Sequence, residues 1–191
     1  YSTERMAELS DLLARSEKRF DTSIYLMADT PYGSITYDGV KNPLFFKNHP
    51  NTLIAHSFSK ELGIAGERLG FLAVNPAAEH RESLQGAFAF TNRTLGFVNA
   101  PALMQRVVER SLEAKVNVEA YKERRDALCD GLAREGYEFD MPEGAFYLFP
   151  RSPVPDDVRF AREMAKENVL VVPGSGFGRK GYVRVAYCVT A

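Results

Sequence analysis

Two apolar runs separated by a short polar loop place the tightest constraint on how this chain folds. The runs span residues 51–57 and 69–74, and each has the length and composition of a buried β-strand. The end of the first run and the loop that follows carry two hydroxyls, an amine and a guanidinium, on Ser57, Ser59, Lys60 and Arg68. We therefore expect a sharp turn at the end of one strand, with these polar groups gathered there.

The rest of the first hundred residues alternates between helical and strand patterns. A helix is predicted from Ser2 or Thr3 to about Phe20, a strand over 23–28 and another helix over 75–89. This alternation favours an α/β fold with a mostly parallel sheet and helices on both faces. Ligands of such sheets bind beyond the carboxyl ends of the strands, which is where Asp29 and Lys60 are expected.

The second half of the chain is predicted to form a smaller α+β domain. An uninterrupted helical pattern over 102–134 would make a helix of about 45 Å, long enough to link two domains. Beyond it the sequence predicts a helix over 156–168 and three strands, over 145–149, 169–172 and 182–187. The predicted domains are 1–103 and 104–191, and the second includes the linking helix.

Composition and charge exclude several classes of protein. A net charge of -1 gives no electrostatic reason to bind nucleic acid or an anionic membrane. The two cysteines, Cys129 and Cys188, are too few for a disulfide framework, and no apolar run or signal-peptide pattern indicates membrane insertion or secretion. The histidines lack the spacing of metal ligands. We therefore expect a cytoplasmic protein without a metal, and its abrupt ends suggest part of a longer chain.

The polar loop has the chemistry that pyridoxal 5'-phosphate (PLP) requires. The aldehyde of PLP needs an amine, which Lys60 offers, and its phosphate needs donors, which Ser57, Ser59 and Arg68 offer. Each residue taken singly also fits an ordinary role, as a solvated cation or as a partner of the loop backbone. The spacing of all four together favours the cofactor. His56 beside Ser57 does not form a hydrolase pair, because adjacent strand residues face opposite sides.

The segment Ser57-Phe58-Ser59-Lys60, followed by Gly66-Glu67-Arg68-Leu69-Gly70, resembles the lysine signature of the class I/II aminotransferases. These are PLP enzymes of fold type I, and the resemblance covers nearly the whole chain. It implies that Lys60 forms the Schiff base with PLP and that Ser57, Ser59 and Arg68 hold the phosphate. It also implies that 1–103 is the second half of the large PLP-binding domain.

Two further segments resemble the same family. Asp29-Thr30-Pro31-Tyr32 is similar to its Asp-x-x-Tyr motif, which implies that Asp29 pairs with the pyridine nitrogen and Tyr32 bonds the ring hydroxyl. The strand around Arg184 resembles the one whose arginine grips the substrate carboxylate. Without the resemblance, Asp29 would be read as a turn cap and Tyr32 as a packing residue, while Arg184 would fit a substrate carboxylate and a surface acid equally well.

The function implied by the resemblance is transfer of an amino group from an amino acid to a 2-oxo acid by a ping-pong mechanism. The family's sites form in homodimers, and its N-terminal half supplies cofactor contacts that this chain lacks. We therefore expect this chain alone to bind PLP weakly and to turn over poorly. Two alternatives stay open: a PLP-dependent β-lyase or other amino-acid-modifying enzyme of the same fold, and a non-catalytic ligand-binding regulatory domain.

Overall fold

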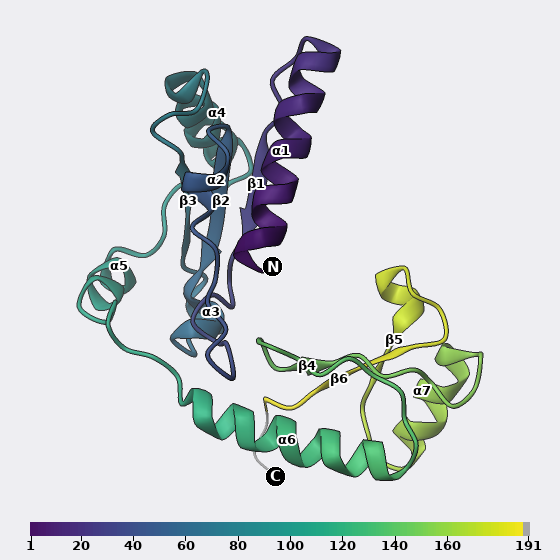
Figure 1. Ribbon diagram of the computed structural model, residues 1–191. Helices are drawn as coiled ribbons and strands as arrows, with labels where there is room; N and C mark the ends of the chain where they lie inside the picture. Colours follow the sequence, from purple (N-terminus) through teal and green to yellow (C-terminus); the bar gives the residue numbers. More distant parts are fainter. Residues whose placement is uncertain (189–191) are drawn as a thin grey trace. The chain divides into compact units, whose positions relative to one another are not determined.

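The computed structural model describes residues 1–188, so the last three residues of the predicted domain 104–191 lie outside the described part. The chain forms two compact units (Figure 1). The first contains Tyr1–Ser34 and Lys41–Val116, and the second contains Ile35–Val40 and the chain from Asn117 onward. The division falls after Val116, and a short segment from the first half of the sequence belongs to the second unit.

The first unit is built on a three-stranded sheet in the order β1-β2-β3, with β1 at Leu26–Asp29, β2 at Thr52–Ser57 and β3 at Gly70–Val74. β1 runs parallel to β2 and β3 runs antiparallel to it, so these three strands form a mixed sheet, whereas the sequence predicted a mostly parallel one. Residues 30–51 give the long crossover that parallel pairing needs. After β2 the chain turns back through one short helical turn, α3 (Phe58–Glu61), and the 3-10 helix η1 (Ala65–Glu67).

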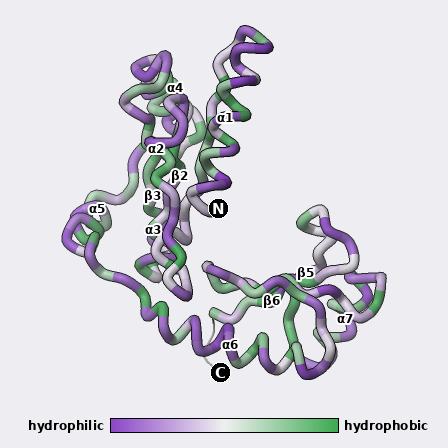
Figure 2. The backbone as a smooth tube through the Cα atoms, viewed as in Figure 1, coloured by the Kyte–Doolittle hydropathy of each residue, from purple (hydrophilic) through white to green (hydrophobic). Residues whose placement is uncertain are grey.

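Local sequence signals place α1 where it was expected. It spans Thr3–Phe20, and the Ser2 hydroxyl accepts a hydrogen bond from the Arg5 amide (3.3 Å), as an N-cap should. The strands β2 and β3 are hydrophobic along most of their length (Figure 2). A one-turn helix, α2 (Phe45–Asn48), lies on the crossover to β2. No helix within residues 1–188 combines the length and the apolar character needed to cross a bilayer.

The helix predicted over 75–89 begins later than expected. α4 spans Arg81–Thr94, and the residues before it form a turn. Asn75 organises that turn: its side-chain oxygen accepts from the Ala77 amide (3.1 Å), and its amide group donates to the Phe46 carbonyl (2.9 Å). A buried asparagine that bonds to the backbone in this way competes with helix formation, which explains the shifted start.

The prediction of one long helix over 102–134 is also wrong. Two helices occupy this region, α5 (Ala102–Glu109) and α6 (Val118–Arg134), and the residues between them are turn and irregular chain. The Asn117 side chain accepts from the Ala120 amide (3.1 Å) and so starts a new helix. The Val116 amide donates outside the helix, to the Glu61 carbonyl (3.3 Å). A cap and a tertiary hydrogen bond therefore override an unbroken helical pattern.

The second unit contains a small antiparallel sheet in the order β4-β6-β5, together with α6, α7 (Asp157–Lys166) and the 3-10 helix η2 (Gly174–Phe177). Its strands are β4 (Tyr147–Leu148), β5 (Val172–Pro173) and β6 (Val183–Ala186), each shorter than predicted. The segment 35–40 joins this unit through Tyr37, whose hydroxyl donates to the Ala145 carbonyl. Its core includes Ile35, Tyr37, Cys129, Leu148 and Val183, all nearly inaccessible to solvent.

An ion pair also anchors the segment 35–40. Buried Arg125 donates to Asp38 (2.7 Å) and to the Pro142 carbonyl (2.9 Å), and its guanidinium lies over the Tyr37 ring, 4.6 Å from the centroid. The hydrogen bond from Arg125 lowers the pKa of Asp38 below its ordinary value. The folded state therefore binds protons at Asp38 less readily than the unfolded state does.

This lowered pKa predicts a pH dependence of stability. A carboxyl group whose pKa is lower in the folded state stabilises the fold above its unfolded pKa, and the contribution is lost as the pH falls through the folded pKa. We expect Asp38→Asn to be less stable than the unsubstituted protein at neutral pH, and the gap to narrow between about pH 5 and pH 3. Urea unfolding of the two proteins at neutral pH and across this acidic range measures the difference between their unfolding free energies. A gap that stays constant or widens on acidification would contradict it.

Candidate active site at the carboxyl ends of two strands

Lys60 lies in α3, which starts directly where β2 ends. Ser57 is the N-cap of this helix: its hydroxyl oxygen accepts from the Ser59 amide (3.2 Å) and its hydroxyl donates to the Ser59 hydroxyl (2.7 Å). Ser57, Ser59 and Lys60 are each partly buried. The end of the strand and a single helical turn thus hold the amine and both hydroxyls close together in the chain.

Arg68 is held near the same turn by the backbone. It has a left-handed conformation (φ 54°) at the end of η1, and its guanidinium donates to the Ala65 carbonyl (2.9 Å). The neighbouring Leu69 carbonyl accepts from the Phe58 amide (3.1 Å), so the chain at Arg68 is tied back to the start of α3. The Arg68 side chain is exposed, which leaves most of its donors open to an anion.

Gly70 allows the two strands to approach beside Ser57. These residues are opposite each other in the β2–β3 pair, and a Cβ at Gly70 would collide with the His56 carbonyl oxygen. We expect Gly70→Ala to destabilise the first unit by about 2 kcal/mol, because backbone cannot move aside as a flexible side chain can. The matched control is Gly66→Ala, since a Cβ there meets no atom within 4 Å. Urea unfolding compares the two, and equal losses would contradict this account.

Asp29 occupies the carboxyl end of β1. It is opposite Ala55 in the parallel pair, two residues before Ser57. The structure brings Asp29 and Ser57 to one open cavity of about 300 Å³, which is also lined by Ala55, His56, Gly70, Phe71, Leu72 and Asn92. Asp29 is exposed, and Tyr32 lies partly buried in the turn that follows. The lining residues of this cavity include neither Tyr32 nor Lys60.

Arg184 belongs to the second unit, in the middle of β6. Its guanidinium lies over two aromatic rings, 4.5 Å from the centroid of Tyr147 and 4.3 Å from that of Phe177. Such contacts hold an arginine head group in place while they leave its edge donors open. The other predicted site residues all belong to the first unit.

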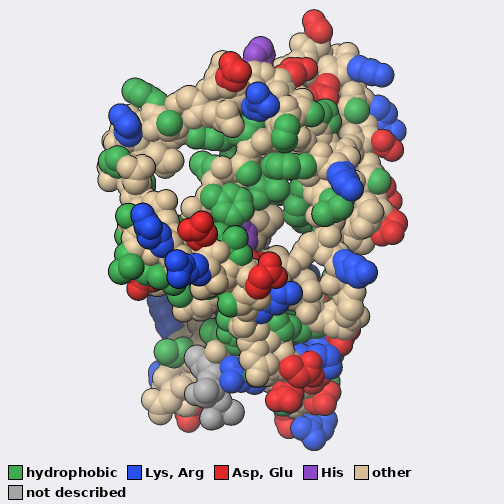
Figure 3. Space-filling view, turned by 90° about the vertical axis from the view of Figure 1, so that its left-hand side faces the viewer, with side chains coloured by type: hydrophobic (Ala, Val, Ile, Leu, Met, Phe, Trp, Pro, Cys, Tyr) green, Lys and Arg blue, Asp and Glu red, His purple; other side chains and the backbone are tan. Residues whose placement is uncertain are grey.

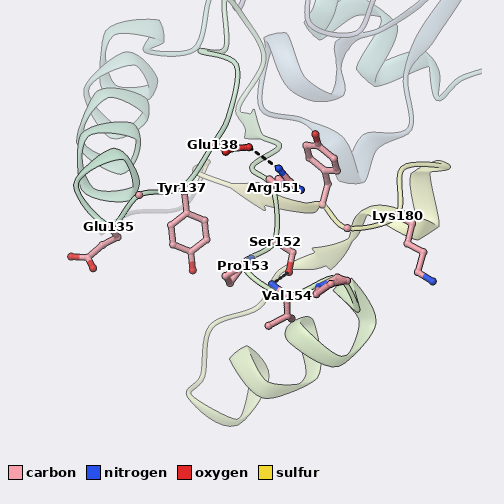
Figure 4. A pocket seen from close by; sticks show the side chains of 12 residues that line it. Glu135, Tyr137, Glu138, Arg151, Ser152, Pro153, Val154 and Lys180 are labelled. Atoms are coloured by element: carbon pink, nitrogen blue, oxygen red, sulfur yellow. Dashed lines mark hydrogen bonds and ion pairs between the residues drawn. The ribbon is translucent and has the colours of Figure 1, made fainter.

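A larger cavity, of about 830 Å³, lies in the second unit and contains no predicted site residue (Figure 4). On one side Arg151 forms an ion pair with Glu138 (3.0 Å), and the Ser152 hydroxyl accepts from the Val154 amide (3.3 Å). Its charges are mixed in sign, and the ion pair joins two exposed side chains. The size of a cavity is thus no guide to the chemistry in this chain, because the chemically distinctive groups lie elsewhere.

Sequence reasoning missed three polar residues of the first unit. His56 and Asn92 line the cavity with Asp29 and Ser57, and Glu61 approaches His56 from α3 (3.3 Å between Nε2 and Oε2). Glu61 directly follows Lys60, so its position beside the amine was visible in the sequence. Its approach to His56 depends on how α3 packs against β2, which no local pattern encodes.

Solved structures of aminotransferases share this fold. An aminotransferase from Eubacterium rectale superimposes on the whole chain with a TM-score of 0.94 at 40% identity, and the match covers 48% of that protein. Aspartate aminotransferase from Thermotoga maritima gives a TM-score of 0.81 at 25% identity, again over the whole chain. The model of the aminotransferase class I and II family matches residues 5–191. The chain belongs to this family, whose members depend on PLP.

Curated proteins with similar sequences are also aminotransferases. Aspartate aminotransferase of Pyrococcus horikoshii is 32% identical over 178 residues, which is 89% of this chain and 45% of the relative. Aromatic-amino-acid aminotransferase 2 of Thermococcus litoralis is 33% identical, over 93% of this chain and 48% of its own length. The chain spans about half the length of the curated relatives it matches.

Proposed function

We propose that this chain is part of a PLP-dependent aminotransferase that moves an amino group from an amino acid to a 2-oxo acid by a ping-pong mechanism. One observation carries the proposal: Lys60 lies in the single helical turn at the carboxyl end of β2, and Asp29 ends the strand paired with β2. Family membership supports the reaction class. The amino acid side chain that the enzyme prefers is left open.

The groups of the first unit fit the cofactor in their chemistry. PLP, when bound, supplies an aldehyde and an electron-withdrawing pyridine ring. We assign the amine to Lys60 and the phosphate donors to Ser57, Ser59 and Arg68. The buried Ser34 hydroxyl has no hydrogen-bond partner among the described residues. An unsatisfied buried hydroxyl in the segment that follows Asp29 is consistent with a site completed by a further group.

The remaining roles follow from charge and geometry. The Asp29 carboxylate would keep a proton on the pyridine nitrogen, and the Tyr32 hydroxyl would bond the ring oxygen. Lys60 Nζ would take the α-proton of the substrate and return it, which requires an unprotonated amine held in place by a short turn. Arg184 would bind the substrate carboxylate through its two parallel donors, in an orientation that the Tyr147 and Phe177 rings help to hold.

Exposed apolar surface supports a larger assembly around the first unit. β1 and β3 each pair only with β2 among residues 1–188, and Met27, Phe71 and Leu72 are 56%, 47% and 44% exposed. Figure 3 shows hydrophobic side chains gathered in the upper part of one face. Open strand edges with apolar side chains favour further pairing. We propose that the sheet continues into further strands of a large PLP-binding domain.

The predicted domains are part of the same proposal. Residues 1–103 would belong to the large domain, and 104–191 would form the smaller C-terminal one. A homodimer and a cytoplasmic location stay predictions. Weak cofactor binding by this chain alone is also expected, because the chain spans only about half the length of these relatives.

Chemical trapping tests the proposal. The chain is incubated with excess PLP and reduced with borohydride, and the modified lysine is located by peptide mass spectrometry. We expect Lys60 to be the main site, because it lies among the phosphate donors. Modification spread over exposed lysines such as Lys41 and Lys180, with Lys60 unmodified, would refute the proposal.

Product analysis of the active protein then separates the enzyme classes. A new amino acid, formed from an added 2-oxo acid, indicates transfer. Ammonia released together with pyruvate indicates a lyase. Capture of PLP without any turnover indicates a binding module.

A further inference from the structure

We propose that His56 and Glu61 are positioning residues that hold the turn carrying Tyr32 against the helical turn carrying Lys60. The proposal rests on the proposed function, because it concerns the relative placement of two of its groups. Neither side chain is assigned a contact with cofactor or substrate. Together they connect residues 30–34 to α3 by hydrogen bonds at Thr30 and Ser34 and by the close His56–Glu61 pair.

His56 makes the first half of this connection. Its Nδ1 lies 2.9 Å from the Thr30 carbonyl oxygen and 3.2 Å from the Thr30 hydroxyl. The ring packs beside two phenylalanines, with centroids 5.0 Å from Phe58 and 4.9 Å from Phe71. Its side chain is only 11% exposed. The imidazole is therefore fixed by packing as well as by polar contacts.

Glu61 makes the second half. One carboxylate oxygen lies 3.3 Å from His56 Nε2, and the other accepts a hydrogen bond from the Ser34 amide (2.6 Å). The carboxylate passes close to Gly33, where an added Cβ would lie 3.0 Å from it. The side chain is 17% exposed. One carboxylate thus holds both His56 and the far end of the turn that contains Tyr32.

A single helical turn needs such an anchor. α3 has four residues, and a helix of this length is not stable without tertiary contacts. Glu61 follows Lys60 directly, so a bond at the Glu61 side chain limits how the backbone at Lys60 can move. A reacting group displaced by about 1 Å can cost on the order of 100-fold in rate. Loss of the His56–Glu61 contacts is therefore expected to slow the reaction of Lys60 with PLP much more than it weakens the binding of PLP.

The first measurement needs no cofactor. We expect Glu61→Ala to speed amide hydrogen exchange at Ser34, because the amide loses its acceptor. Glu61→Gln keeps an acceptor oxygen and should restore much of the protection. Glu113→Ala, at an exposed glutamate between α5 and α6, is the matched control and should leave Ser34 unchanged. Exchange in peptides of α1, elsewhere in the first unit, reports whether the variants remain folded.

The second measurement follows borohydride-trapped PLP at Lys60 as the PLP concentration is raised. Glu61→Ala and His56→Leu are each expected to lower the limiting rate about tenfold, with little change in the half-saturating concentration. Glu61→Gln should recover part of the rate. A purely structural loss would instead lower the folded fraction and leave the limiting rate of the folded molecules unchanged.

The outcomes separate the two proposals. If the unsubstituted chain captures no PLP at Lys60, the proposed function fails and the positioning roles fail with it. If that chain captures PLP and both variants capture it at the same limiting rate, only the positioning roles are overturned. Faster exchange at Ser34 together with slower capture at Lys60, partly rescued by Glu61→Gln, supports them.

Discussion

Lys60→Ala is expected to abolish covalent capture of PLP and to lower amino transfer by the active protein on the order of 10⁴-fold. Lys60 is assigned both the bond to the cofactor and the movement of the α-proton, and a positioned acid–base group alone contributes up to about 10⁴-fold. Alanine leaves no amine in α3. The measurements are trapped PLP by mass spectrometry and the rate of formation of the new amino acid.

Exposed Lys47 supplies the matched control for this variant. Lys47→Ala should retain capture and turnover, because its side chain lies outside the turn that holds Ser57, Ser59 and Lys60. If Lys60→Ala loses the covalent adduct while a regulatory binding function persists, the chain is a non-catalytic relative. Retention of full turnover by Lys60→Ala would remove the basis of the proposed mechanism.

Gly174→Ala is expected to destabilise the second unit by about 3 kcal/mol or more. Gly174 is buried, its amide donates to the Tyr182 carbonyl (2.7 Å), and it is the first residue of η2, directly after β5. A Cβ there would collide with the Arg179 carbonyl and lie 2.6 Å from the Tyr182 carbonyl. Because both obstacles are backbone, the collision can be relieved only by moving the chain at Arg179 or at Tyr182, and Tyr182 directly precedes β6, the strand that carries Arg184.

Gly176→Ala tests whether the loss comes from crowding. Gly176 lies in the same 3-10 helix, but a Cβ there meets no atom within 4 Å. Its stability should remain within about 1 kcal/mol of the unsubstituted protein. Hydrogen exchange of peptides covering β6, followed with increasing urea, reports on the second unit alone. Similar losses of stability in both variants would show that the loss comes from reduced flexibility of the chain and not from crowding at Gly174.

The elements predicted well are those specified by residues near one another in the sequence. Ser2 caps α1 through an amide three residues away, and Ser57 caps the turn of Lys60 through an amide two residues away. The apolar runs that form β2 and β3 are recognisable as strands because each is short and is bounded by residues typical of turns. Short-range hydrogen bonding and hydrophobicity suffice for these features.

The predictions that failed depend largely on partners distant in the sequence. The pattern over 102–134 is helical residue by residue, yet the Val116 amide donates to Glu61 and the helix is broken between α5 and α6. The direction of β3 is a similar case, since an apolar run has the same composition in a parallel or an antiparallel pair. Segment 35–40 joins the second unit because buried Arg125 reaches Asp38, 87 positions away.

The sequence alone identified the chemical groups of the candidate site. These are an amine, hydroxyls and a guanidinium spaced along one turn, with an acid at the end of an earlier strand. Those groups are covalent properties, and a strand followed by a capped turn is enough to present them. Tertiary packing decided which of them share a cavity, how Glu61 spans His56 and Ser34, and where the helices end. Such contacts form only when segments far apart in the chain bury surface against each other, and a local sequence pattern does not predict which segments do so.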